Sequence, residues 1–171
     1  MKTKDLVTSS ILLALGLVLH YICPPLLFGV KPDFLLATMF ISIIICSDLK
    51  STLAIGTAAG IITAMTTGMP GGQLANFIDK IITSMFFHFI CIKLSKNNIN
   101  VIKLSISVFL STLLSGAIFL FIVKTMAGAP INMGYLLVTI VLPTSIFNIL
   151  FSNILIKSLS MAGLKSVQTH N

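Results

Sequence analysis

The sequence contains no arginine, no glutamate and no tryptophan, and its charged residues are eleven lysines and four aspartates among 171 positions. Charged residues make up only 9% of the chain and hydrophobic residues 56%, whereas a soluble domain carries roughly 25% charged residues. So few charges cannot cover the surface of a water-soluble protein of this length. The composition therefore predicts an integral membrane protein that is surrounded by lipid.

The usual signatures of catalysis are also missing. The sequence has no GxxxxGK[ST] phosphate loop, no HExxH motif and no paired-carboxylate or Ser/His/Asp arrangement. Its three cysteines are far apart and lack CxxC spacing, which favours buried thiols over a disulfide or a metal site. The lysines form no basic run, which argues against nucleic-acid binding. We expect no catalytic residue, no metal and no cofactor.

Apolar segments separated by polar residues, proline or glycine predict an all-α protein with one transmembrane domain over residues 1–171. The first segment follows lysines, as in a signal sequence, but it is too long and lacks a small-x-small cleavage site, so we expect a first span. Fusing the second and third segments would place Asp48 and Lys50 at mid-membrane, which is costly. Six spans are therefore expected, at 6–22, 34–46, 53–67, 74–94, 101–123 and 135–158.

The lysines predict the orientation, because cytoplasmic loops of membrane proteins are enriched in positive charge. With the N-terminus inside, the inner side holds Lys2, Lys4, Lys50, Lys93, Lys96, Lys103, Lys157 and Lys165, and the outer side holds Lys31, Lys80 and Lys124. An even number of spans then returns the C-terminus to the cytoplasm. The outer connections are apolar and rich in proline and glycine. This composition favours loops that cover a binding site as lids; turns that pack on helix ends are the alternative.

The strongest polar pattern begins the fourth expected helix, GGQLANFIDK at 71–80. One helical face there carries Gln73, Asn76, Lys80, Thr83 and Phe87. Asp79 flanks this face. Ionisable side chains inside a span usually face a cavity or each other and mark a substrate path. We expect this face to bind substrate; an ion pair that joins this helix to a neighbour is the alternative.

Two further features stand at other helix ends. Lys31 and Asp33 precede the second expected helix, where Asp33 is a good N-cap whatever else it does. Asn148 lies one turn beyond Thr144 in the last helix, so it can bond either a ligand or another helix. On the first helix, Ser10-x-x-x-Ala14 places two small residues on one face, as helices that approach another helix closely often do.

Five parts of the sequence together resemble one family: MKTKDLV at 1–7, His20, KPD at 31–33, GGQLANFIDK at 71–80 and LPTSIFN at 142–148. They resemble the TrpP-type tryptophan transporters over nearly the whole chain and in the same order. That family looks like the substrate-binding S components of energy-coupling factor (ECF) transporters. The stretch GQ-x-x-N-x-x-DK is the most specific part of the match.

The resemblance implies an ECF S-component-like bundle in the cell membrane that binds L-tryptophan in the outer half of the bilayer. Its partners would be a transmembrane coupling protein (EcfT-like) and two cytoplasmic ATPases. Small residues on the first helix, here Ser10 and Ala14, would contact the coupling protein. Such S components are thought to topple in the membrane to release substrate inside.

Tryptophan is a zwitterion, so its site needs an anion for the ammonium and a cation for the carboxylate. Asp79 is our candidate for the ammonium, and Lys80 or Lys31 for the carboxylate. The acceptor for the indole N–H would be Asn76, Gln73 or Asn148. The apolar slot for the ring would draw on Phe28, Phe77, Met69 and Phe147.

Two alternatives stay open at this point. One is an S component for another small molecule, such as a vitamin. The other is a stand-alone facilitator that transports amino acids as an oligomer without ATPase partners.

The orientation is testable with reporter fusions. A phosphatase that is active only outside the cytoplasm should be active when fused after residue 130 and inactive when fused after Lys50, because the lysine asymmetry keeps the second connection inside. Activity of the two fusions in the opposite order would contradict the predicted topology.

Overall fold

The computed structural model describes residues 3–23, 33–93, 100–127 and 132–162. All regular secondary structure in these residues is helical. The helices are α1 (Thr3–Ile22), α2 (Phe34–Cys46), α3 (Leu49–Thr66), α4 (Gly72–Phe87), η2 (His88–Lys93), α5 (Val101–Ala127), α6 (Met133–Leu136), η3 (Leu137–Val141) and α7 (Leu142–Met161), where η2 and η3 are π-helical. The predicted all-α class is confirmed.

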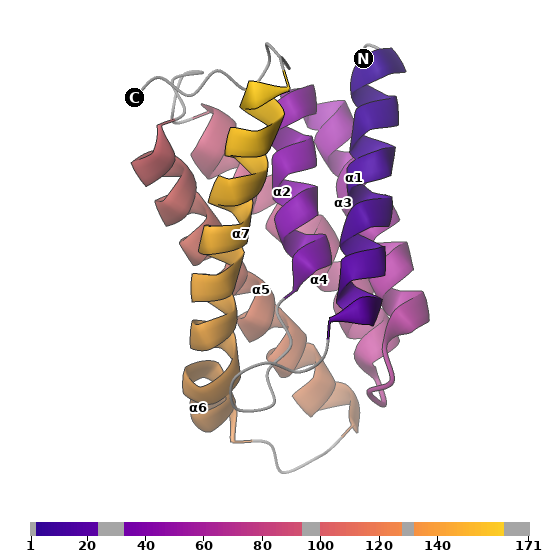
Figure 1. Cartoon of the computed structure of the whole chain (residues 1–171). Helices are drawn as coiled ribbons and strands as arrows, with labels where there is room; N and C mark the ends of the chain where they lie inside the picture. Colours follow the sequence, from indigo (N-terminus) through magenta and orange to yellow (C-terminus); the bar gives the residue numbers. More distant parts are fainter. Residues whose placement is uncertain (1–2, 24–32, 94–99, 128–131, 163–171) are drawn as a thin grey trace.

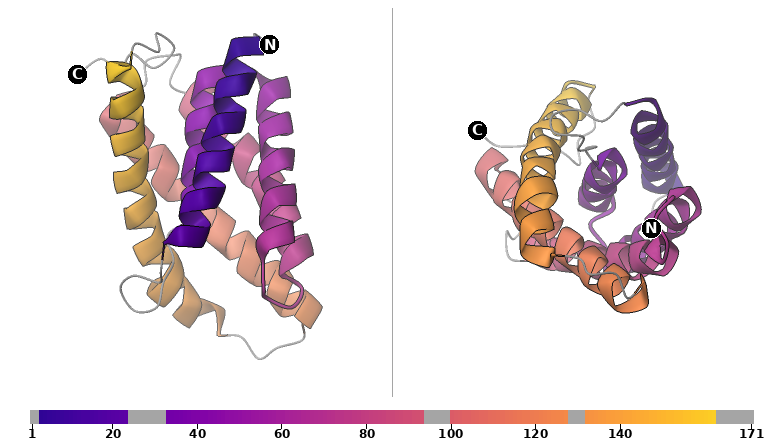
Figure 2. Two further views of the ribbon diagram at one scale, coloured as in Figure 1. Left: turned by 45° about the vertical axis from the view of Figure 1, so that its right-hand side comes forward. Right: turned by 90° about the horizontal axis from the view of Figure 1, so that it is seen from below.

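The helix α2 forms the centre of the bundle. Viewed from below, it lies inside the ring that the other helices make (Figure 2). All of its residues from Leu35 to Ile45 are buried, so it has no lipid-facing side. A helix that is apolar on every face lies either in lipid or in a protein core; here it is the core, since α1, α3 and α7 all pack against α2.

The third helix is longer than the sequence pattern indicated. We expected it to begin at residue 53, but it begins at Leu49 because Asp48 caps it. The carboxylate of Asp48 accepts hydrogen bonds from the backbone N–H of Ser51 at 2.9 Å and from its hydroxyl at 2.8 Å. These bonds hold the pKa of Asp48 below its ordinary value. The connection between α2 and α3 therefore consists of Ser47 and Asp48 alone. Ser47 adopts the left-handed conformation that ends α2.

The last expected helix, 135–158, is a composite of α6, η3 and α7. The π-helical turn η3 comes directly before Leu142 and Pro143, the first two residues of α7. A π-turn widens the helix locally and is often found at functional sites. Opposite it, a Cβ on Gly116 of α5 would collide with the side chain of Val141. The glycine thus lets η3 approach α5 closely.

Within the described part of the chain, five helices have the length and apolarity needed to cross a membrane, and α2 is a shorter apolar helix of 13 residues. The expected multi-pass location in the cell membrane agrees with these helices. The first residues of α1 and the last residues of α7 lie at the same end of the bundle (Figure 1), the end that the lysine pattern predicts to be cytoplasmic.

Close packing of α3 on α4 depends on glycine. A Cβ on Gly56 would meet the side chain of Ser84 and the carbonyl of Lys80. We therefore expect Gly56→Val to lower the free energy of unfolding by about 1–3 kcal/mol, the usual cost of an overpacked helix contact. Thermal unfolding of the purified protein in detergent measures this. The matched control is Gly68→Val, since nothing lies within 4 Å of a Cβ on Gly68; equal melting temperatures for both variants would contradict the prediction.

Candidate functional site

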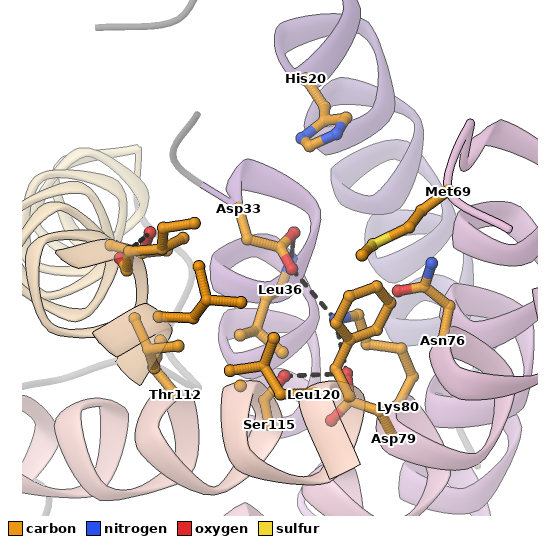
Figure 3. A pocket seen from close by; sticks show the side chains of 16 residues that line it. His20, Asp33, Leu36, Met69, Asn76, Asp79, Lys80, Thr112, Ser115 and Leu120 are labelled. Atoms are coloured by element: carbon orange, nitrogen blue, oxygen red, sulfur yellow. Dashed lines mark hydrogen bonds and ion pairs between the residues drawn. The ribbon is translucent and has the colours of Figure 1, made fainter. Parts of the chain in front are cut away.

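A cavity of about 380 Å³ lies between α2, α4, α5 and the α6–η3 segment, in the half of the bundle where α1 ends and α2 begins (Figure 1). Its size falls within the range of small-molecule sites. Figure 3 shows the side chains that surround it. They are His20, Asp33, Leu36, Met69, Asn76, Asp79, Lys80, Thr112, Ser115, Gly116, Phe119, Leu120, Leu136, Ile140, Val141 and Thr144.

Three charged side chains gather at one side of this cavity. The Lys80 ammonium lies 2.9 Å from an Asp79 carboxylate oxygen and 3.0 Å from an Asp33 carboxylate oxygen. Lys80 is 2% exposed and Asp79 is fully buried, whereas the Asp33 side chain is 26% exposed. The ammonium of α4 thus bridges its own helix to the start of α2, as the dashed lines in Figure 3 show. We call Asp33, Lys80 and Asp79 the charge cluster.

Neutral donors complete the hydrogen bonding of the two carboxylates. Thr83 donates to one oxygen of Asp79 at 2.9 Å, and Ser115 of α5 donates to the other at 2.8 Å. Asp33 caps α2, as its position before an apolar run predicted, by accepting a bond from the backbone N–H of Leu36 at 3.0 Å. Such bonds offset part of the cost of removing carboxylates from water.

The structure brings together four of the residues that the sequence indicated: Asp33, Asn76, Asp79 and Lys80 all line the cavity. Asn76 also donates to the carbonyl of Thr63 at 3.5 Å. Two of the five residues on the predicted helical face, Asn76 and Lys80, therefore line the cavity, together with Asp79 beside that face. The ion pair that was the alternative expectation is also present, because Lys80 of α4 pairs with Asp33 at the start of α2.

Other candidates lie elsewhere. Gln73 is exposed and does not line the cavity, and Phe77 packs against Gly60 in the contact between α3 and α4. Asn148 is fully buried behind the cavity lining and donates to the Thr112 hydroxyl at 3.4 Å. Lys31 lies outside the described residues.

The candidates for the ring slot divide in the same way. Met69 lines the cavity, whereas Phe147 does not, and Phe28 lies outside the described part of the chain. On α1, Ser10 and Ala14 are both exposed on the outside of the bundle, where another membrane helix can reach them.

Sequence reasoning missed the contribution of α5. Thr112, Ser115 and Phe119 recur at spacings of three and four residues on the cavity face of this helix. The sequence does show this spacing, but α5 is so apolar that two small hydroxyl residues did not stand out. His20, one of the residues that carry the family resemblance, also lines the cavity.

The chemistry of the site is that of binding. With all three groups ionised, the charge cluster has one positive and two negative charges, so it is matched to a ligand that supplies a further cation. The rest of the lining is mostly apolar and includes Phe119, which suits a ring system. Among the described residues, no group of three or more histidine, cysteine or acidic side chains is placed to hold a metal ion.

Comparison with known proteins identifies the family. Residues 2–162 match the family model described as tryptophan transporter TrpP. The chain belongs to the TrpP tryptophan transporter family. It is 40% identical over 156 residues to a "Probable tryptophan transport protein" of Clostridium acetobutylicum, with 91% of each chain covered.

Two further relatives of the TrpP family carry the same description. The protein of Clostridium perfringens is 37% identical, covering 95% of this chain and 96% of its own, and the protein of Bacillus subtilis is 36% identical with 86% of each covered. No solved structure matches the chain. The family resemblance read from the sequence is confirmed.

The charge cluster predicts the effect of removing its cation. Lys80→Met would leave the fully buried Asp79 and the partly exposed Asp33 without their lysine partner, which we expect to cost about 3–5 kcal/mol of unfolding free energy, mainly through Asp79. Thermal unfolding in detergent is the measurement. Adding Asp33→Asn and Asp79→Asn to the same variant should recover much of the loss, since the uncompensated charges are then gone. A single variant as stable as the wild type would contradict the prediction.

Proposed function

We propose that this protein binds L-tryptophan in the cavity and mediates its uptake. The observation that carries the proposal is the charge cluster of Asp33, Lys80 and Asp79 beside an otherwise apolar cavity of about 380 Å³. An aromatic amino acid presents the complementary pair of a cationic head and an apolar ring. The names of the family and of its relatives support the choice of tryptophan.

In the proposed pose, the ammonium of tryptophan lies between the carboxylates of Asp33 and Asp79, where charge-assisted hydrogen bonds are strong. Lys80 remains between the same two carboxylates and offsets part of their negative charge. This arrangement favours Lys31 over Lys80 as the partner of the substrate carboxylate, because Lys80 already neutralises two neighbours. The indole extends towards Phe119 and Met69.

The proposed acceptor for the indole N–H is Asn148 or Asn76. The Oδ1 of Asn148 has no hydrogen-bond partner. The Nδ2 of Asn148 donates to the hydroxyl of Thr112, which lines the cavity. Asn76 lines the cavity directly. Gln73 is a weaker candidate because its side chain is exposed.

We further propose that the chain is the S component of an ECF-type importer, with an EcfT-like coupling protein and two cytoplasmic ATPases as partners. The sequence carries no nucleotide-hydrolysing motif, so driven uptake needs another subunit. Ser10 and Ala14 are exposed on α1, as contact residues for the coupling protein must be. Transport by this chain alone, as an oligomeric facilitator, is the second candidate.

Tryptophan binding to the isolated protein tests the site. We expect binding without nucleotide, and a loss of about 10- to 100-fold in affinity for Asp79→Asn, because a charged hydrogen-bond partner is removed at nearly constant volume. Calorimetric titration measures both. Leu74→Ala on the same helix, whose side chain is exposed and does not line the cavity, is the matched control and should keep wild-type affinity, while histidine and thiamin should not compete. Wild-type affinity in Asp79→Asn would refute the site, and competition by a vitamin would favour another substrate.

Uptake into proteoliposomes separates the two transport modes. Under the S-component proposal, uptake of labelled tryptophan requires the coupling protein, the ATPases and ATP. Uptake by liposomes that contain this chain alone would instead support the facilitator.

A further inference from the structure

His20 brings α1 into contact with the cavity. It lies in the last turn of that helix, and among the described residues that line the cavity it is the only one from α1. Its side chain is half-buried, whereas the next two residues, Tyr21 and Ile22, are exposed. Figure 3 shows the imidazole pointing from α1 into the cavity. The last turn of α1 therefore offers the cavity one side chain, and that side chain can donate a hydrogen bond in either protonation state.

Asp33 is the member of the charge cluster that lies near His20. A positive charge on the imidazole acts on the Asp33 carboxylate. Asp33 is also the most accessible member of the cluster, with its side chain 26% exposed against 2% for Lys80 and 1% for Asp79. Its carboxylate accepts from Lys80 and from the backbone of Leu36, which leaves about two of its four acceptor positions for a ligand.

The geometry of an α-amino acid connects His20 with the substrate. The ammonium and the carboxylate are bonded to the same carbon, so the partner of the carboxylate must lie next to the partner of the ammonium. His20 meets this condition, since it lies near Asp33, where the proposed pose puts the ammonium. Lys80 is already held between two carboxylates at 2.9 and 3.0 Å. A carboxylate accepts several hydrogen bonds, so His20 can bind it together with the proposed Lys31.

Charge balance distinguishes an amino acid from an amine at this site. With its groups ionised, the charge cluster carries one net negative charge, from two carboxylates and one ammonium. A cationic amine therefore balances the cluster by itself. An amino acid brings a carboxylate as well, and a carboxylate taken out of water without a partner is costly. Acceptance of the amino acid thus requires a further donor beside the cluster, and His20 lies in that place.

We propose that His20 donates to the carboxylate of the bound substrate and that this contact makes the site select an amino acid over the corresponding amine. The proposal rests on tryptophan binding in the cavity and adds a determinant of selectivity to it. Asp33 and His20 then form two neighbouring subsites, one for each charge of the zwitterion. The apolar part of the lining binds the ring, which the amino acid and the amine share.

Binding of two ligands tests the assignment. Tryptamine has the ring and the ammonium of tryptophan but lacks the carboxylate, so it does not use the His20 contact. In His20→Leu, which removes the ring donors, we expect the affinity for tryptophan to fall about 10- to 100-fold, the usual effect of losing a hydrogen bond to a charged group. The affinity for tryptamine should stay the same or rise, because no imidazolium then competes for Asp33. Calorimetric titration of the purified protein measures both.

Two further variants are the controls. Tyr21→Leu introduces the same side chain at the next position of α1, where the native residue is 63% exposed, and should leave both affinities at wild-type values. His20→Gln retains a neutral N–H donor and should recover part of the tryptophan affinity that His20→Leu loses. The ratio of the two affinities in one preparation does not depend on the fraction of the protein that is folded.

The outcomes separate this proposal from the proposed function. An equal loss of both ligands in His20→Leu would show that His20 only supports the fold. Unchanged tryptophan affinity would show that His20 does not bind the carboxylate. Either result overturns the assignment while tryptophan binding stands, and a wild-type protein that binds tryptamine as tightly as tryptophan overturns the selectivity. A wild-type protein that binds neither ligand refutes the proposed function, and this assignment with it.

Discussion

Three neighbouring charges, two of them fully buried, determine how the half of this protein that contains the cavity is built. Asp79 and Lys80 are neighbours in α4, so their side chains alone could pair, but the ammonium also reaches Asp33 at the start of α2. This second bond fixes the depth at which α2 begins relative to α4. Moving charged groups out of water is costly, and only a complete set of partners makes the arrangement stable. The cavity exists where this cluster faces the apolar wall formed by α5 and η3.

The same cluster relates stability to recognition. An ion pair between helices and a substrate site were alternatives at the level of sequence; in the structure, the residues that form the ion pair also line the cavity. Asp79 accepts bonds from Lys80, Thr83 and Ser115, and it still borders the cavity. A ligand ammonium therefore meets carboxylates that are already held in position, which lowers the cost of ordering them on binding.

The sequence was most informative where one signal had a single physical cause. Scarcity of charge predicted lipid surroundings, and Asp33 before an apolar run predicted a helix cap; both are confirmed. Periodicity in α4 placed Asn76 and Lys80 on one face, and both line the cavity. The same periodicity included Gln73, which is exposed, because spacing along one helix does not show how far the neighbouring helices cover that face. The Thr112 and Ser115 contributions depend on how α5 crosses α4, which no local pattern records. The start of α3 was misjudged because Lys50 and Ser51 looked like a loop, while a capping aspartate lets polar residues occupy a first helical turn.

The central helix α2 has a consequence for how the protein sits in bilayers of different thickness. Its 13 residues extend about 20 Å, well short of a hydrocarbon layer of ~30 Å. Because protein rather than lipid surrounds α2, this deficit does not thin the membrane around it. The mismatch is instead absorbed inside the molecule, where Asp33 at the start of α2 lines the cavity. Changes in lipid chain length act on the longer helices around α2, so the depth of Asp33 depends on protein packing rather than on the composition of the membrane.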